Sequence, residues 1–379
     1  MIVVIADDLS GAAELAGTAR EAGLSAEVQT EFDPSSPAEV IAVDTDSRAS
    51  NEADAIAKVS AIARQVVAAK PAWIYKKCDS VLRGHVLAEC RAIATVADKQ
   101  RVLLIPANPG RQRVIRDGRY LVSGVPLDQS PFARDPQHPA RTADVLANLS
   151  EKRDGIYSLR PTEAPHADGV SIPDVWESLH LRERARQVGP ETLAAGAMEF
   201  FTALLRRTPL RSGTAPEFET RSPLRLFACG SHAAWAGTRV RECQGRGVPI
   251  VPMPRRIFEE DFEDREIDQW ADETVGAFAI GDRVMIAIGG EKISGLPPGR
   301  LDSRLADAVR RVLNRVTIGQ LCLEGGATAA SVLGRCGWKR LQVGRAIAPG
   351  LARLQVLNNP APLVLIKPGS YPWPDAVWD

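Results

Sequence analysis

The chain has 379 residues, more than a single hydrophobic core ordinarily organises, so its length predicts two domains. Hydrophobic residues make up 45% and charged residues 25% of the chain, which is typical of a folded globular protein and excludes a disordered one. The 47 basic and 47 acidic residues give a formal net charge of zero. A general nucleic-acid-binding protein would carry a basic excess, so no nucleic-acid partner is expected.

The lengths of the apolar runs and the spacing of cysteine and histidine exclude further classes of protein, namely membrane-spanning, secreted and metal-binding ones. No apolar run approaches the roughly 20 residues that span a bilayer, and MIVVIADD lacks the basic region and cleavage site of a signal peptide. We therefore expect a cytoplasmic protein without a membrane partner. The six cysteines lie at least twelve residues apart and the five histidines lack ligand spacing, so reduced thiols and no metal site in the protein are expected.

The first half alternates short apolar runs with segments of helical length. Strands are predicted over residues 2–6, 41–43, 73–77 and 101–107. Helices are predicted from an N-cap at Ser10 to a C′ glycine at Gly23, and over residues 53–67 and 86–96. This order predicts a mostly parallel sheet with helices on both faces. Asp117-Gly118 interrupts it, because this pair inside residues 114–122 predicts a β-hairpin with a type I′ turn.

A segment without periodicity divides the chain. Residues 206–223, RRTPLRSGTAPEFETRSP, contain three prolines and predict a linker between domains over residues 1–205 and 224–379. The strand–helix alternation then resumes, which predicts two α/β domains in series. The expected strands are 224–229, 249–253, 283–288, 320–323 and 363–366, and the expected helices are 233–243, 301–316 and 327–335.

Four polar clusters follow predicted strands of the first domain. They are Asp7-Asp8 with Ser10, DTDSR at 44–48, KKCDSVLRG at 76–84 and PANPGR at 106–111. Because the carboxyl ends of parallel strands share one edge of a sheet, these clusters should converge. Mixed acids and bases suit a small ligand with a carboxylate and several hydroxyls. Arg83 or Arg48 would hold the carboxylate, and Asp8 or Asp46 would accept from hydroxyls. Alternatively, each cluster is only a helix cap or a solvated turn.

The second domain carries glycine turns after three predicted strands, namely Gly230-Ser231, Gly325-Gly326 with Thr328, and KPG at 367–369. Glycine lets backbone N–H groups approach an anion closely, and a helix N-terminus adds a favourable dipole. These turns predict a phosphate or nucleotide cradle, although tight strand–helix connections use glycine in any case. Neither GxxxxGK[ST] nor GxGxxG occurs, so no known nucleotide fingerprint supports the prediction.

Taken together, these segments resemble the four-carbon acid sugar kinase family. In the first domain the resemblance rests on IADDLSGAAE, DTDSR, KKCDSVLRG, NPGR followed by DGRYLVSGVPL, and FARDP at 132–136. In the second it rests on CGS at 229–231, EGGAT at 324–328, APG at 348–350 and the terminal KPG. The resemblance spans nearly the whole chain.

The resemblance implies an ATP- and Mg²⁺-dependent kinase that phosphorylates the 4-hydroxyl of an acid such as D-threonate, D-erythronate or 3-oxo-tetronate. It implies that residues 1–205 bind the acid sugar and residues 224–379 bind ATP. The residues expected to bind the substrate are Asp7, Ser10, Asp46, Arg48, Arg83, Asn108 and Arg111. The residues expected to contact ATP are Ser231, Gly325, Gly326, Ala327, Thr328 and Gly369. Catalytic roles are expected for Asp8, Lys77 and Asp79.

In phosphoryl transfer a protein chiefly aligns the reactants and offsets charge. Asp8 is the first candidate for the base that accepts the hydroxyl proton, and Asp79 is the second. Lys77 or Arg83 would stabilise charge in the transition state or grip the substrate carboxylate. We expect ATP·Mg²⁺ on the glycine turns to face the acid sugar across an interdomain cleft whose closure excludes water.

Several positions depart from the family pattern. The family more often has Thr where Ser10 stands, and Thr and Asn where Val81 and His85 stand. The ending KPGSYPWPD places Pro372 where a glycine is usual, and proline cannot donate a backbone N–H. A catalytically impaired acid-sugar-binding pseudokinase or sensor is therefore an alternative. A two-domain dehydrogenase is a second, although its GxGxxG is missing. The oligomeric state stays open, with a homodimer as one option.

Overall fold

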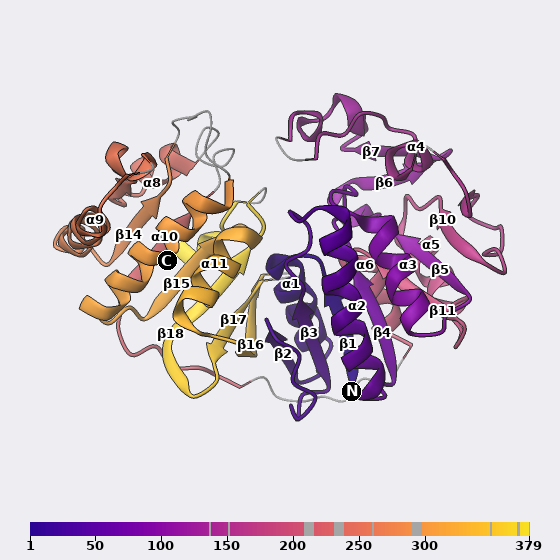
Figure 1. The fold of residues 1–379 in the computed structure, drawn as a ribbon, viewed down its shortest axis with the longest axis horizontal. Helices are drawn as coiled ribbons and strands as arrows, with labels where there is room; N and C mark the ends of the chain where they lie inside the picture. Colours follow the sequence, from indigo (N-terminus) through magenta and orange to yellow (C-terminus); the bar gives the residue numbers. More distant parts are fainter. Residues whose placement is uncertain are drawn as a thin grey trace. The chain divides into compact units, whose positions relative to one another are not determined.

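The computed structural model describes residues 1–135, 138–150, 152–207, 216–230, 239–259, 261–289, 298–348, 351–369 and 372–378, apart from the side chains of residues 298, 360 and 361. The chain forms two compact units (Figure 1). Unit 1 comprises Met1–Glu27 and Phe32–Thr214, and unit 2 comprises Val28–Glu31 and Ala215–Asp379. Both units are α/β, which confirms the predicted fold class. Within the described ranges, no helix is long and apolar enough to cross a bilayer.

Unit 1 is built on a parallel sheet. Seven strands pair parallel in the order β3-β1-β4-β11-β5-β10-β9. The strands are β1 (Ile2–Ala6), β3 (Val40–Asp44), β4 (Trp73–Lys77), β5 (Arg101–Ile105), β9 (Ile156–Leu159), β10 (Gly169–Pro173) and β11 (Thr192–Gly196). Strand β2 (Ala26–Gln29) contains the boundary between the units. The sequence IVVIA of β1 is buried throughout, as a central parallel strand requires.

Helices cover both faces of this sheet. Val3 and Ile5 share a core cluster with Val59 of α2 and Ile93 of α3, whereas Val4, which points the other way, is buried outside that cluster. Helices α2 and α3 lie side by side (Figure 1), and α6 packs against α1 and α5. The helices are α1 (Leu9–Glu21), α2 (Glu52–Ala68), α3 (Val86–Val96), α4 (Val145–Leu149), α5 (Ser178–Arg186) and α6 (Met198–Leu205).

The predicted hairpin is confirmed and forms part of a small antiparallel sheet. Asp117 and Gly118 both have positive φ, at 51° and 69°, as a type I′ turn requires. Asp174 accepts both of their N–H groups, at 2.7 and 3.0 Å. The strands are β6 (Arg113–Arg116), β7 (Arg119–Val122) and β8 (Val125–Pro126), and the nearby 3₁₀ helices are η1 (Pro109–Arg111), η2 (Leu127–Gln129) and η3 (Pro131–Arg134).

Helix α1 begins two residues earlier than predicted. Its N-cap is Asp8, whose backbone is extended and whose side chain accepts from the Gly11 N–H, so the expected cap at Ser10 is wrong. Ser10 lies inside the helix and donates its hydroxyl to Asp8. An aspartate at the N-cap has the same capping chemistry as serine and also carries charge that favours the helix N-terminus. Gly23 has φ 88° and takes the left-handed position after the helix, as expected.

Unit 2 combines parallel and antiparallel strands in the order β13-β14-β12-β15-β18-β17-β16. The first five are parallel, and β18, β17 and β16 pair antiparallel. The strands are β12 (Arg225–Cys229), β13 (Ile250–Pro252), β14 (Arg283–Ala287), β15 (Gln320–Glu324), β16 (Arg340–Ala348), β17 (Leu351–Val356) and β18 (Asn359–Lys367). Strands β16 and β17 are absent from the sequence-based prediction.

Helices also cover both faces of the second sheet. Helices α9, α10 and α11 pack in sequence against one another and against β13, β14, β15 and β18. On the other face, Trp378 stacks on Phe227 with centroids 4.6 Å apart, and Cys243 of α8 joins the same core cluster. The helices are α8 (Val240–Gly245), α9 (Asp264–Ala277), α10 (Pro298–Arg315), α11 (Gly326–Cys336), α12 (Asp375–Trp378) and the 3₁₀ helix η5 (Arg255–Phe258). The first part of the predicted helix 233–243 lies outside the described residues.

Candidate functional site

The topology of unit 1 brings the predicted polar clusters to one edge of its sheet. Ala6, the last residue of β1, lies in register with Asp44 on one side and Lys77 on the other. Gly196 is in register with Lys77 and with Ile105. The residues that follow these positions therefore leave the sheet side by side, which is the position where open parallel sheets bind ligands.

Arg48 joins the first two clusters. Its Nε donates to Asp7 Oδ2 at 2.7 Å and its Nη2 donates to Asp8 Oδ1 at 2.8 Å. Asp8 Oδ1 also accepts from the Gly11 N–H at 2.9 Å, and Asp8 Oδ2 accepts from the Ser10 hydroxyl at 2.5 Å. Asp7 Oδ1 is buried without a hydrogen-bond partner among the residues described. Both carboxylates are thus held in one orientation, and one buried oxygen of Asp7 has no hydrogen-bond partner among the described residues.

Asp79 belongs to the same network through two arginines. Arg83 forms a bidentate pair with Asp79, at 2.8 and 3.0 Å, and Arg48 Nη1 lies 3.9 Å away. Burial opposes ionisation of Asp79, but these two guanidinium groups outweigh it and hold its pKa well below the usual range. Arg83 Nη1 donates to Asp135 Oδ2 at 3.1 Å and its guanidinium lies 5.8 Å from the ring centroid of Phe132. The FARDP segment therefore orients Arg83.

Lys77 approaches Asp8 across the first turn of α1. A Cβ atom on Gly11 would lie 3.2 Å from Lys77 Nζ and 2.8 Å from Asp8 Oδ1. Lys77 Nζ donates to the Cys78 carbonyl at 3.0 Å and lies 3.6 Å from Glu14 Oε2. Glu14 Oε1 in turn accepts from Arg111 Nη1 at 2.8 Å. Glycine at position 11 thus allows the ammonium and the carboxylate to share one small space.

Two predicted substrate residues do not join this cluster. The Asp46 side chain is 69% exposed, and its nearest cationic partner is Lys58 at 4.0 Å. Asn108 is buried, and its Oδ1 accepts from the backbone N–H of Glu199 at 3.0 Å, near the start of α6. Asn108 therefore stabilises the fold at this edge, and Asp46 faces solvent.

The structure adds three carboxylates that the sequence analysis did not select. Glu14 lies one helical turn after Gly11, a spacing that could have identified it. Asp135 stands in the FARDP segment itself. Asp44 is buried at the end of β3, and burial raises its pKa well above the usual range even though it accepts the Asp46 N–H. Asp44 and Asp46 differ in burial, and no local sequence signal reveals that difference.

In unit 2 the predicted glycine turns follow the carboxyl ends of β15 and β18. Gly325 has φ 100°, and its N–H donates to the Lys367 carbonyl at 2.9 Å, which ties the two strand ends together. Gly326 begins α11, and Ala327 is exposed in its first turn. Gly369 follows β18 and is half-buried. Free N–H groups at the start of α11 suit an anion.

Thr328 packs closely on the turn after β12. Its hydroxyl donates to Asp302 Oδ1 at 2.9 Å, and a Cβ atom on Gly230 would lie 2.0 Å from this hydroxyl. Only glycine fits at position 230. Ser231, the other predicted residue of this turn, lies outside the described residues. The described residues contain no group of three or more His, Cys, Asp or Glu side chains that could hold a metal ion.

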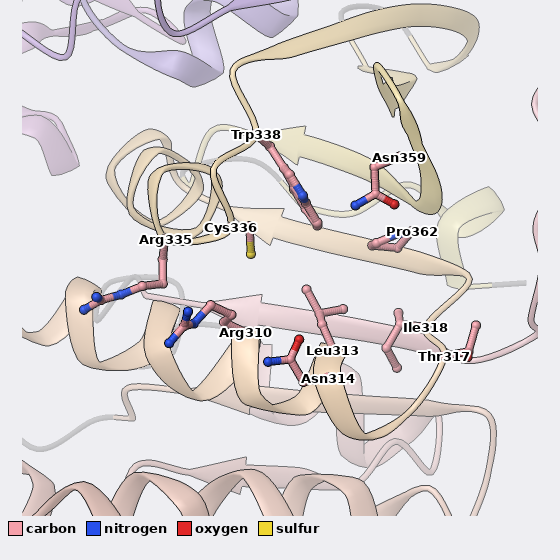
Figure 2. Close-up of a pocket in the computed structure, with 10 residues that line it drawn as sticks. All are labelled: Arg310, Leu313, Asn314, Thr317, Ile318, Arg335, Cys336, Trp338, Asn359 and Pro362. Carbon is pink, nitrogen blue, oxygen red and sulfur yellow. The ribbon is translucent and has the colours of Figure 1, made fainter.

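A pocket of about 520 Å³ lies at the opposite edge of the second sheet (Figure 2). The guanidinium groups of Arg310 and Arg335 lie at one end of it, and Trp338 and Asn359 lie at the other. The pocket lies where α10 and α11 end and β18 begins, so it is separate from the glycine turns. Its lining residues are Arg310, Leu313, Asn314, Thr317, Ile318, Arg335, Cys336, Trp338, Asn359 and Pro362.

The chain is similar to several known proteins. A family model described as a sugar-binding N-terminal domain matches residues 2–193. A D-threonate kinase of Bordetella bronchiseptica is 33% identical over 348 residues, which cover 88% of this chain and 84% of the relative. A 3-oxo-tetronate kinase of Methylobacterium radiotolerans is 24% identical, with 97% and 95% covered. A solved structure from Haemophilus influenzae, a member of DUF1537, has a TM-score of 0.71 at 17% identity, with 99% and 98% covered, so it shares the fold.

Proposed function

Since the chain belongs to the four-carbon acid sugar kinase family, we propose that it transfers the γ-phosphate of ATP to the terminal hydroxyl of a tetronate-like acid such as D-threonate, D-erythronate or 3-oxo-tetronate. Unit 1 binds the acid and unit 2 binds the nucleotide. The observation that carries this proposal is the approach of Lys77 and Asp8 over Gly11, beside a buried Asp7 oxygen that has no hydrogen-bond partner among the described residues. An ammonium beside carboxylates matches an anionic, hydroxyl-rich ligand.

Lys77 is the better candidate for the substrate carboxylate or for charge in the transition state. The guanidinium groups of Arg48 and Arg83 are already engaged by carboxylates of the protein itself. An ammonium has three donors, and Lys77 uses one on the Cys78 carbonyl and directs one toward Glu14. One donor therefore remains for a ligand, whereas the two arginines serve chiefly to orient Asp8 and Asp79.

Asp8 is the better candidate for the base. Arg83 and Arg48 hold the pKa of Asp79 well below its usual range against the effect of burial, and this makes Asp79 a weak proton acceptor. Asp8 Oδ2 accepts only the Ser10 hydroxyl among the contacts described, so it retains a lone pair for a substrate hydroxyl.

The first turn of α11 fits a nucleotide phosphate. The segment 325–328 combines positive φ at Gly325, a helix N-terminus and the hydroxyl of Thr328. Magnesium accompanies ATP by accepting oxygen ligands from the phosphates and from one or two carboxylates, and it would neutralise phosphate charge when bound. Asp302, which already bonds Thr328, provides a carboxylate of this kind. Asp302 and Thr328 are therefore the residues that we assign to the Mg²⁺ of the nucleotide.

The test is a coupled ADP-release assay with a panel of tetronates, their 2- and 3-oxo forms, and pentonates. Asp8→Asn should lower kcat about 100- to 10,000-fold on the best substrate, because the proton acceptor is lost. The Kd for ATP·Mg²⁺, measured by calorimetry, should stay at the wild-type value. Asp98→Asn is the matched control, since Asp98 is exposed and has a positive φ of 51°, which asparagine tolerates.

Near-normal turnover by Asp8→Asn would exclude Asp8 as the base. Calorimetry and the ADP-release assay together distinguish a kinase from the pseudokinase alternative. A sensor would bind a tetronate but would neither bind ATP·Mg²⁺ nor release ADP. Those two negative results together would refute the kinase proposal.

A further inference from the structure

Three strands of unit 2 end beside one another at buried residues, each directly before a glycine turn. Cys229 of β12 is in register with Glu324 of β15, and Glu324 is in register with Lys367 of β18. Glu324 is 1% exposed and Lys367 is 3% exposed. The register of the strands therefore places the carboxylate of Glu324 and the ammonium of Lys367 beneath the turns that we assign to ATP.

A single carboxylate binds three donors from separate parts of the chain. Glu324 Oε1 accepts from Arg239 Nη2 at 2.9 Å and lies 3.0 Å from Lys367 Nζ. Glu324 Oε2 accepts from the indole N–H of Trp373 at 3.2 Å. Lys367 Nζ lies 4.9 Å from the Trp373 ring centroid, and the Gly325 N–H donates to the Lys367 carbonyl.

Two of these donors follow a glycine turn in the sequence, and the third, Lys367, precedes one. Arg239 precedes α8 and follows the turn at Gly230, and Trp373 follows the turn at Gly369. A carboxylate with so little exposure is stable only because two cations and an N–H group replace its water. If the carboxylate is removed, the turns at Gly325 and Gly369 lose a shared anchor.

We propose that Glu324 is a positioning residue for nucleotide binding: it fixes the turns at Gly325 and Gly369 relative to one another so that their N–H groups meet the phosphates together. This inference rests on the proposed binding of ATP by unit 2. Glu324 does not bind the phosphates itself, because it is buried and carries the same sign of charge. It acts through Arg239, Lys367 and Trp373.

The protonation of Lys367 gives a readout that a purely structural role would not move. Burial lowers the pKa of Lys367 to about 8, Glu324 opposes this effect, and Arg239 adds to it. Cys229 and the ring of Trp373 are the other groups that face the ammonium. Lys367 is thus protonated and paired with Glu324 below pH 8 and loses its proton above it. ATP affinity should therefore fall between pH 7 and pH 9.

Glu324→Gln is the test, with Glu242→Gln as its matched control. Glu242 also pairs with Arg239, but it is 25% exposed and has no contact with Lys367 in the residues described. For Glu324→Gln we expect the Kd and KM for ATP·Mg²⁺ to rise about 10- to 100-fold, the range for a lost hydrogen bond to a charged group. The KM for the acid sugar should stay the same. The pH dependence of the Kd should flatten, because neutral glutamine no longer supports the charge of Lys367 at pH 7.

Trp373→Phe covers the case in which Glu324→Gln does not fold. It keeps the aromatic ring and removes only the indole N–H, and we expect a Kd for ATP·Mg²⁺ about 3- to 10-fold above wild type. Wild-type ATP affinity in a folded Glu324→Gln or in Trp373→Phe, with only a lower Tm, would overturn the inference. If the wild-type protein itself does not bind ATP·Mg²⁺, the proposed function fails first, and the positioning role fails with it.

Discussion

Replacing Gly11 with alanine should separate activity from stability in this protein. Gly11 is the third residue of α1, and its N–H donates to Asp8 Oδ1. A methyl group there would lie 2.8 Å from Asp8 Oδ1, 3.2 Å from Lys77 Nζ and 3.3 Å from Lys77 Cγ. A carbon cannot remain 2.8 Å from the Asp8 oxygen, so the carboxylate and the ammonium must move apart.

The two effects of this change on stability nearly cancel. Alanine is favoured over glycine in a helix by about 1 kcal/mol. Displacing Asp8 weakens the N-cap of α1, which costs about 1 kcal/mol. The free energy of unfolding should therefore change little, and Tm should stay within about 4 °C of the wild-type value. Activity has no such compensation, since a displacement of about 1 Å in a reacting group lowers turnover about 100-fold.

The assay is kcat and KM for the best tetronate by ADP release, with Tm recorded on the same samples. Gly276→Ala is the control, because Gly276 lies in α9 and a Cβ atom there meets nothing within 4 Å. The control variant should be slightly more stable than the wild type, because alanine has the higher helix propensity, and it should keep full activity. If Gly11→Ala keeps the wild-type kcat and KM, Asp8 and Lys77 do not act together on the substrate.

Two further predictions concern charges of unit 1. Lys76 and Glu89 form a buried ion pair with Nζ and Oε2 2.5 Å apart, so Glu89→Gln should destabilise unit 1 by about 3–5 kcal/mol in urea unfolding. Replacing both residues with methionine should recover most of this loss, and an equal loss in both variants would contradict the reasoning. Arg83 and Arg48 lower the pKa of Asp79 despite its burial. The ionised Asp79 therefore stabilises the fold above about pH 4, and this contribution is lost as the pH falls below that value. Asp79→Asn should flatten the acid side of the stability profile, and an unchanged profile would count against the pairing.

Local patterns predicted many of the elements well. Strand β1, helix α3 and the type I′ turn at Asp117-Gly118 follow from apolar periodicity and from backbone preferences within a few residues. The N-cap of α1 was misassigned because Asp8 and Ser10 both have capping side chains, and only the backbone conformation separates them. Strands β16 and β17 were not predicted, because they follow one another directly and pair antiparallel, whereas the rest of the domain alternates strand and helix.

The sequence alone determined the α/β class, the positions of the polar clusters after the strands, and the likeness to acid sugar kinases. These features depend on residues close together in the chain. Only the tertiary structure decided which charged side chains meet: Asp135 with Arg83, Glu14 with Lys77 and Arg111, and Asp46 with solvent. Such contacts join residues 52 to 97 positions apart, and register and burial, which local sequence does not encode, select among equally suitable partners.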